Sequence, residues 1–269
     1  MNGSDARNII LTVEGISKNF GSVQALNDVS LEVYADEVVG LVGDNGAGKS
    51  TLVKILSGNF PPDRGAIFLE GKKVHFKSPS DAREKGIETV YQDLALCGNL
   101  DTVANLFIGR EICRNFLGIK ILQNGEMDRQ AAEVLGRIGT NFPAIREKVE
   151  FLSGGQRQTV ALGRFVNWGN KLILLDEPTA ALGVRETRQA LELVAKTRKE
   201  KGVSMILISH NLQHVFQIVD RIIVMRHGKI VGVREKGKTT PDEIVSLITG
   251  AVFINKEAED QESPNPSLQ

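Results

Sequence analysis

The amino-acid sequence predicts an α/β fold, in which a buried parallel sheet is interrupted by an inserted helical lobe. Three runs are apolar without alternation: Val38 to Val42, Leu172 to Leu175 and Met205 to Ile208. Such runs are typical of strands that are buried on both faces of a parallel sheet. Between roughly residues 94 and 168 the apolar spacing becomes helical. The 269 residues are enough for a large core with such an insertion.

Short strands are predicted before and after these buried runs. Leu11 to Phe20, Val29 to Tyr34 and Ala66 to Phe76 mix β-branched and apolar residues, and Glu70-Gly71-Lys72 is a turn within the last of them. Arg221 to Val233 has His227-Gly228-Lys229 at its centre and is predicted to form a hairpin. Each buried run leads into a polar turn, as expected where ligands lie at the carboxyl ends of parallel strands.

Three helices are predicted in the lobe. Asp101 is suited to cap a helix from Thr102 to Ile108, and Glu126 to Ile138 and Gly155 to Val166 have helical spacing. A further helical stretch, Thr51 to Ser57, follows the first buried strand.

The domain boundaries follow from these elements and from composition. We expect one domain over residues 9–250, with its core in 9–93 and 169–250 and the helical lobe in 94–168. Beyond Ile254 the chain is mainly Glu, Asp, Gln, Ser and Pro. Residues 251–269, and the polar residues 1–8, are therefore expected to be disordered. The chain shows no internal repeat.

Charge and cysteine content restrict the class of protein. Lys+Arg and Asp+Glu are 33 each, so the formal net charge is zero, whereas a protein that grips nucleic acid usually has a basic excess. Cys97 and Cys113 have no metal-ligand spacing and are expected to be reduced thiols in a cytoplasmic protein. We find neither a signal-peptide pattern nor an apolar run of the roughly 20 residues that span a bilayer. Any membrane-spanning part would belong to another chain.

A phosphate-binding loop is predicted directly after the first buried strand. The residues Gly43, Asp44, Asn45, Gly46, Ala47, Gly48, Lys49, Ser50 and Thr51 fit the pattern G-x-x-x-x-G-K-[ST] in a strand–loop–helix context. Glycines let backbone N–H groups turn towards a polyphosphate, and the helix N-terminus adds positive potential. Lys49 can reach the β- and γ-phosphates and the Ser50 hydroxyl can bind Mg²⁺. The alternatives are a glycine-rich turn or a dinucleotide site, but the latter would need glycine in place of Thr51.

Two carboxylates end the second buried strand. Asp176 is placed to hold Mg²⁺, and Glu177 to orient and deprotonate an attacking water. Phosphoryl transfer requires mainly positioning and charge stabilisation, which these groups supply. The alternative is an ordinary acidic pair that caps a strand.

A second anion site is predicted at Leu152 to Gln156. Ser153 is a good N-cap, and Gly154-Gly155, followed by Gln156, exposes backbone N–H groups at the start of a helix. Because the chain already has one complete phosphate loop, this site suggests that ATP is gripped from two sides. The second grip would come from a partner copy.

These motifs resemble those of the ATP-binding cassette (ABC) transporter ATPases over about residues 9–250. The phosphate loop, the signature segment Leu152 to Gln156 and the run Asp176-Glu177-Pro178-Thr179 occur in the family's order. The resemblance implies a P-loop NTPase (RecA-like) core with an antiparallel β subdomain and an inserted helical lobe. It also implies binding of ATP and Mg²⁺ and hydrolysis between two head-to-tail copies.

Three further positions take roles only through this resemblance. Gln92 resembles the glutamine that senses the γ-phosphate and Mg²⁺, and His210 resembles the switch histidine that contacts the γ-phosphate. Phe20 lies where the family stacks an aromatic ring on adenine. The alternatives are a solvated loop glutamine, a structural histidine and a strand aromatic that faces the core.

Two features favour importers of ribose, xylose or fructose type. Ala180-Ala181-Leu182-Gly183 replaces the common Ser-Ala-Leu-Asp, so the aspartate that couples the two ATP sites is missing at Gly183. Tyr91-Gln92-Asp93-Leu94 and Gly109-Arg110-Glu111 also resemble these sugar importers. The expected partners are a second copy, a sugar permease in the membrane and, indirectly, a sugar-binding protein, at the cytoplasmic face of the inner membrane.

The permease would dock beside Gln92, roughly over Asp93 to Glu111. The apolar residues of that stretch either take part in docking or form the lobe core; they are Leu94, Leu96, Leu100 and Phe107.

Two other functions are weighed against import. A soluble ABC ATPase acting on DNA or ribosomes would need a long coiled coil or a second cassette with a charged linker, and the sequence has neither sustained heptads nor a repeat. A non-hydrolysing ATP sensor would lack the base or the phosphate ligands, and none is missing. No nucleic-acid partner is expected.

Overall fold

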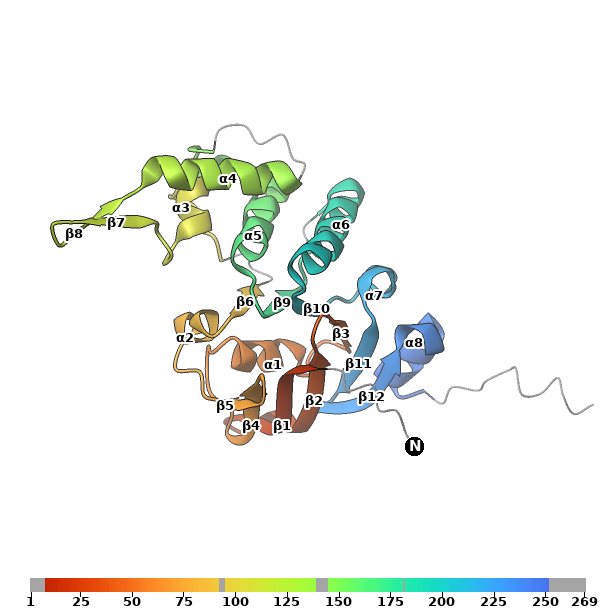
Figure 1. Cartoon of the computed structure of the whole chain (residues 1–269). Helices are drawn as coiled ribbons and strands as arrows, with labels where there is room; N and C mark the ends of the chain where they lie inside the picture. Colours follow the sequence, from red (N-terminus) through yellow and green to blue (C-terminus); the bar gives the residue numbers. More distant parts are fainter. Residues whose placement is uncertain (1–7, 92–94, 139–144, 181, 252–269) are drawn as a thin grey trace, which may run out of the picture.

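The computed structural model describes residues 8–91, 95–138, 145–180 and 182–251. The strands of the two larger sheets lie together in a lower body, and a lobe that carries helices and the β7 and β8 strands extends from it at the top left of the view (Figure 1). The tails predicted at residues 1–8 and 251–269 lie outside the described residues except for Asn8 and Ala251. Asn8 accepts a hydrogen bond from Ala35 N–H at 2.7 Å, so the folded domain includes it.

An antiparallel sheet forms the N-terminal part of the domain. Its strand order is β2-β1-β4-β5, with β1 (Ile9–Phe20), β2 (Val23–Tyr34), β4 (Arg64–Leu69) and β5 (Lys72–Val74). A tight turn pairs Phe20 with Val23, and Gly21 provides the left-handed residue of that turn at φ 58°.

The second sheet has the order β12-β11-β3-β10-β9-β6. Its strands are β3 (Val38–Val42), β6 (Ile87–Val90), β9 (Leu172–Asp176), β10 (Ser204–Ile208), β11 (Arg221–Arg226) and β12 (Lys229–Glu235). All neighbours are parallel except β11 and β12, which form the predicted hairpin. Every residue of β3, β9 and β10 is buried. The prediction of a buried parallel sheet is confirmed.

Helices cover both faces of this sheet. On one face, α1 (Lys49–Leu56) packs with the antiparallel sheet in one hydrophobic core. The opposite face packs in a second core with the helices α5 (Gly154–Trp168), α6 (Val184–Lys201), α7 (Leu212–Ile218) and α8 (Pro241–Thr249). The short helices α2 (Pro79–Glu84) and η2 (Lys236–Lys238) precede β6 and α8.

The lobe has a third core of its own. It is formed by α3 (Thr102–Phe107), α4 (Asn124–Ile138), the 3₁₀ turn η1 (Val149–Phe151) and the outer part of α5. Asp101 caps α3 as predicted, because its carboxylate accepts a hydrogen bond from Ala104 N–H at 2.6 Å. The lobe also contains a hairpin where only helices were expected, formed by β7 (Cys113–Phe116) and β8 (Ile119–Leu122).

None of the helices in the described part of the chain is both long and apolar enough to cross a bilayer.

Candidate active site

The phosphate loop joins the end of β3 to α1. Gly43, Gly46 and Gly48 all have positive φ, and Gly48 is the left-handed residue that precedes α1. A Cβ at Gly48 would lie 2.7 Å from the carbonyl oxygen of Ala25, so only glycine fits there. The Ala47 N–H donates to the Asp44 carbonyl oxygen at 3.1 Å, and the loop lies at a helix N-terminus, the position that favours a polyphosphate.

Lys49 lies inside the loop. Its Nζ donates hydrogen bonds to the carbonyl oxygens of Gly43 at 2.7 Å and Asp44 at 2.9 Å. Burial lowers the pKa of the Lys49 ammonium, and the carboxylates of Glu177 and Asp176 oppose that shift. The lysine is thus held at the centre of the loop, among carbonyl oxygens that a γ-phosphate can replace.

Asp176 ends β9 beside Ser50. Burial raises the pKa of the Asp176 carboxyl, and the Ser50 hydroxyl beside it opposes that shift. Its Oδ1 atom is buried and has no hydrogen-bond partner in the structure. A hydroxyl and an unsatisfied carboxylate oxygen are the hard ligands that Mg²⁺ accepts, usually with one or two protein ligands and phosphate oxygens completing the shell. The residues present therefore fit a Mg²⁺ ion. Across the described residues no cluster of three or more His, Cys, Asp or Glu competes as a metal site.

Glu177 follows directly and is also buried. Its backbone has φ 52°, a left-handed conformation that is uncommon for a non-glycine residue and that is often found at functional sites. Burial raises the pKa of Glu177 to about 7, and the His210 backbone N–H opposes the shift. His210 Nδ1 lies 3.0 Å from Glu177 Oε1, without the alignment of a hydrogen bond. A carboxyl with a pKa near neutrality is suited to accept a proton from water.

These side chains line one cleft. Parallel pairing of β9 and β10, and of β10 and β3, places the ends of the three strands side by side. The cleft is lined by residues 45–51 of the phosphate loop, by Asp176, Glu177, Ile208 and His210, and by Val23, Gln24 and Ala25 of β2. The β2 residues were not predicted, because nothing in their sequence differs from ordinary strand residues.

Phe20 lies at the end of β1 and is 48% exposed, so it does not face the core. Its ring meets Phe60 edge to face, with centroids 5.4 Å apart. Lys18 Nζ lies 5.8 Å from the Phe20 centroid. Phe20 does not line the cleft itself, but it pairs directly with Val23 of β2, which does, and its exposed ring has a surface available for stacking.

The signature segment lies outside this cleft. Ser153 and Gln156 form a reciprocal cap at the start of α5: Gln156 N–H donates to Ser153 Oγ at 3.2 Å, and Ser153 N–H donates to Gln156 Oε1 at 2.9 Å. Ser153 and Gly154 are exposed. None of the residues 153–156 lines the phosphate cleft of the same chain.

One contact that the sequence did not suggest joins α5, the helix of the signature segment, to the turn at Glu177. The buried Gln158 side chain in α5 donates a hydrogen bond from Nε2 to the carbonyl oxygen of Pro178, next to Glu177. The predicted sensor Gln92, and Asp93 and Leu94 beside it, lie outside the described residues.

Of the other apolar candidates for docking, Phe107 is fully buried against Trp168, and Leu96 packs on the lobe core. For these two residues the structure favours the alternative of core packing.

Comparison with known proteins agrees with these motifs. The family model described as ABC transporter matches residues 26–180. The chain is 47% identical to the xylose/arabinose import ATP-binding protein XylG of Sulfolobus acidocaldarius, over 89% of this chain and 94% of the relative. It is 44% identical to the fructose import ATP-binding protein FrcA of Rhizobium meliloti, over 94% and 98%. It is 39% identical to a ribose import ATP-binding protein, RbsA of Caldanaerobacter subterraneus, but spans about half of that protein, 48%.

Solved structures show the same fold. A nucleotide-free ATP-binding cassette from an ABC transporter superposes with a TM-score of 0.73 at 27% identity, over 90% of this chain and 95% of that one. The ADP conformation of MJ1267, another such cassette, gives 0.72 at 26% identity, over 90% and 96%. The predicted P-loop NTPase fold is confirmed. With its phosphate loop, paired carboxylates and signature segment in place, the chain belongs to the ABC transporter family, as one of its ATP-binding and ATP-hydrolysing proteins.

Proposed function

We propose that this chain is the ATP-hydrolysing subunit of a monosaccharide importer, and that it binds ATP and Mg²⁺ between two head-to-tail copies of itself. The observation that carries the proposal is the separation of the two anion sites. The phosphate loop, Asp176, Glu177 and His210 share one cleft, whereas the capped signature segment at Ser153 is exposed elsewhere. A partner copy that supplies Ser153 would close the cleft over ATP.

The chemistry of the closed site follows from the cleft residues. Lys49 exchanges its loop carbonyl partners for the β- and γ-phosphates, and the loop N–H groups hold the remaining phosphate charge. Ser50 and Asp176 would hold Mg²⁺, with Gln92 added by resemblance to the family; when bound, the ion would neutralise charge on the phosphates. Glu177 accepts the proton of the attacking water, and His210 lies close enough to orient that carboxylate.

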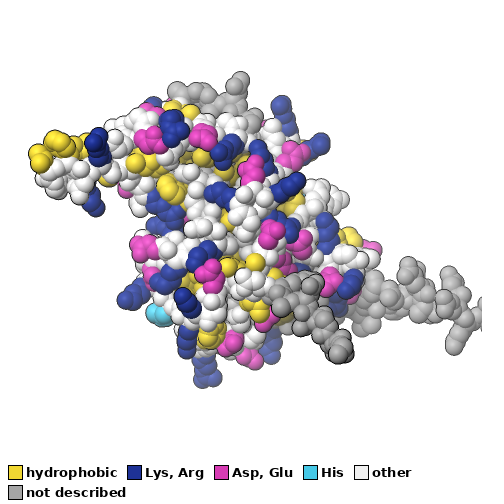
Figure 2. Space-filling model, in the orientation of Figure 1, with side chains coloured by type: hydrophobic (Ala, Val, Ile, Leu, Met, Phe, Trp, Pro, Cys, Tyr) yellow, Lys and Arg dark blue, Asp and Glu magenta, His cyan; other side chains and the backbone are white. Residues whose placement is uncertain are grey.

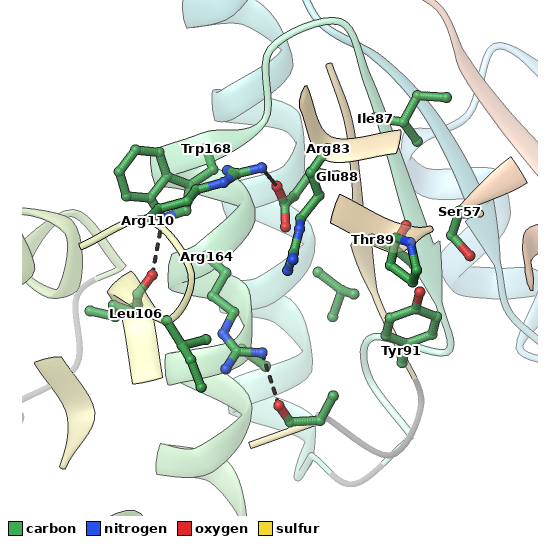
Figure 3. A pocket seen from close by; sticks show the side chains of 15 residues that line it. Ser57, Arg83, Ile87, Glu88, Thr89, Tyr91, Leu106, Arg110, Arg164 and Trp168 are labelled. Carbon is green, nitrogen blue, oxygen red and sulfur yellow. Dashed lines mark hydrogen bonds and ion pairs between the residues drawn. The ribbon is translucent and has the colours of Figure 1, made fainter. Parts of the chain in front are cut away.

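A groove between the core and the lobe is the proposed permease-docking site. Figure 3 shows its walls, which come from α2, β6, α3 and α5. Arg110 contacts the buried Glu88 carboxylate at 2.9 Å and stacks 5.1 Å from the centre of Trp168. Arg164 donates to the carbonyl oxygens of Asn105 at 2.9 Å and Ala95 at 3.0 Å. The two arginines of the groove are therefore held in place by contacts within the chain.

The groove lies where a conformational change at the ATP site could be transmitted to a bound permease. Tyr91, which precedes Gln92, lines the groove. Its hydroxyl accepts a hydrogen bond from Asn59 Nδ2 at 3.1 Å, and Asn59 lies just beyond α1, the helix that follows the phosphate loop. A permease segment seated there would touch both the lobe and the core, so a change in their relation on ATP closure would reach the membrane.

The cargo class rests on the relatives, whose names specify import of xylose or arabinose, fructose and ribose. By extension this chain acts at the cytoplasmic face of the inner membrane, with a sugar permease and, indirectly, a sugar-binding protein. No nucleic-acid partner is proposed; the longest helix of the described chain, α6, has 18 residues and does not form the arm of a long coiled coil.

A pull-down tests this function. Glu177→Gln, which should bind ATP without turnover, is loaded with Mg-ATP and incubated with detergent-solubilised native membranes; Glu192→Gln on the exposed face of α6 is the matched control. Recovery of a multi-spanning permease with a sugar-binding protein is expected. Recovery of ribosomal or nucleic-acid partners alone would replace the transport proposal and leave the ATPase assignment intact.

A further inference from the structure

The β7–β8 hairpin projects from the end of the lobe (Figure 1). All eight of its strand residues are exposed, and within the described chain no third strand pairs with either of them. A two-stranded hairpin that buries neither face is only marginally stable in water. The hairpin therefore has surface on both faces that its own chain does not cover.

The tip of the hairpin is apolar and strained. Phe116, Leu117 and Ile119 are 58%, 87% and 67% exposed. Leu117 has φ 48° and is followed by Gly118 at φ 83°, so both turn residues are left-handed. Such turns favour Asn, Asp or Gly at the first position, where leucine pays a steric cost. A strained, exposed leucine gives no stability to the chain itself, which indicates that its side chain serves a contact outside the chain.

Two cationic side chains, Arg114 and Lys120, lie next to this tip on opposite faces of the hairpin. Phe116 pairs with Ile119, Arg114 with Ile121 and Asn115 with Lys120. Because side chains alternate along a strand, Arg114 lies on the face of Phe116 and Ile119, while Lys120 lies on the other face. Residues 113–122 contain no Asp or Glu. In Figure 2 apolar side chains gather at this tip, with Lys and Arg side chains beside them.

We propose that the β7–β8 tip inserts into the surface of a lipid bilayer that carries anionic headgroups. A bilayer offers an apolar medium ahead of the tip and negative charge around it on every side, which matches an apolar point with a cation on each face. This contact is independent of the permease groove, which is lined by other residues.

Vesicle co-sedimentation of the full chain tests the proposal. The probes are phosphatidylcholine vesicles with and without about one third phosphatidylglycerol, a content at which cations bind measurably. The tip variant is Leu117→Asn with Ile119→Thr, which keeps a turn-compatible residue and a β-branched strand residue. The charge variant is Arg114→Gln with Lys120→Gln. Val233→Thr, an exposed strand valine on β12, is the matched control.

The proposal predicts preferential binding to the anionic vesicles. The tip variant should lose binding about five-fold or more, the charge variant about five-fold per cation removed, and the control should bind as the parent does. ATP turnover measured in parallel reports that each variant is folded and tests the ATPase site separately. Equal binding by parent and tip variant, or equal binding to neutral and anionic vesicles, would overturn the proposal. Tip-dependent self-association without lipid would assign the surface to a second copy instead.

Discussion

His210 Nδ1 lies 3.0 Å from Glu177 Oε1, and the pair spans the boundary between buried and exposed parts of the cleft: the Glu177 side chain is 5% exposed and that of His210 is 60%. The protein thus shields the Glu177 carboxylate from water, while the His210 imidazole is accessible to a nucleotide in the cleft. Burial raises the basicity of Glu177, while His210 lines the open cleft in which a γ-phosphate would lie.

Glu177→Gln should lower ATP turnover by at least about 100-fold, because it removes the proton acceptor but keeps the size of the side chain. Binding of ATP should persist, since Lys49 and the loop N–H groups are unchanged. Phosphate release and equilibrium nucleotide binding measure the two effects. Full turnover by this variant would exclude Glu177 as the base; Glu192→Gln should behave as the parent.

The turnover of the parent chain should rise with pH around neutrality. Glu177 must be ionised to accept a proton, and its pKa is about 7 in the folded chain, so kcat/KM should increase from pH 6 to pH 8. A flat profile over this range would contradict the assignment.

Stability should show the opposite trend from the same group. A carboxyl whose pKa is 4.5 ordinarily and about 7 when folded favours folding fully below pH 4.5, and that contribution is lost as the pH rises to 7. Glu177→Gln does not titrate, so its Tm relative to the parent should be higher at pH 8 than at pH 5. Thermal unfolding of the two proteins at both values measures this difference.

The fold was predictable where burial leaves a clear sequence pattern. β3, β9 and β10 are buried on both faces and hence continuously apolar, and Asp101 caps α3 by an ordinary local bond. The β7–β8 hairpin was missed because both of its faces are exposed and its turn, Leu117-Gly118, lacks the usual Asn or Asp. α6 was not assigned, although Thr187, Ala190, Leu191 and Val194 carry helical spacing.

The grouping of the candidate site was predictable where its residues follow strand ends, since Lys49, Asp176, Glu177 and His210 line one cleft at the ends of adjacent strands. Contacts between distant segments left no local pattern. The Gln158 bond to Pro178 and the arginines of the groove depend on how the lobe packs on the core, whereas the β2 lining of the cleft depends on how the antiparallel sheet packs beside the phosphate loop.

Gly43→Ala should destabilise the chain more than Gly46→Ala does. Both glycines have positive φ, but a Cβ at Gly43 would overlap the carbonyl oxygen of Met225, whereas a Cβ at Gly46 meets nothing within 4 Å. We expect losses of more than about 2 kcal/mol for Gly43→Ala and about 1 kcal/mol for Gly46→Ala. Denaturant unfolding without nucleotide compares them; equal losses would show that the loop can move away from β11.

Ile108→Asp should reduce permease recovery at least about ten-fold, because it places an unpaired charge in a groove that a partner would desolvate. Ile108 lines the groove and is 38% exposed, so the charge is tolerated in the free chain. Val245→Asp on α8, which is exposed to a similar degree, is the control. Unchanged recovery would place the docking site elsewhere.

The claim that ATP is held between two copies is tested most directly by sedimentation velocity of Glu177→Gln with Mg-ATP, alone and combined with Ser153→Arg. Thr240→Arg, which removes the equivalent N-cap from α8, controls for loss of a helix cap. We predict a dimer for Glu177→Gln and for its Thr240→Arg combination. The Ser153→Arg combination should remain a monomer that still binds ATP through its own phosphate loop. An ATP-dependent dimer that survives Ser153→Arg, or a Glu177→Gln chain that stays monomeric with saturating Mg-ATP, would contradict the account.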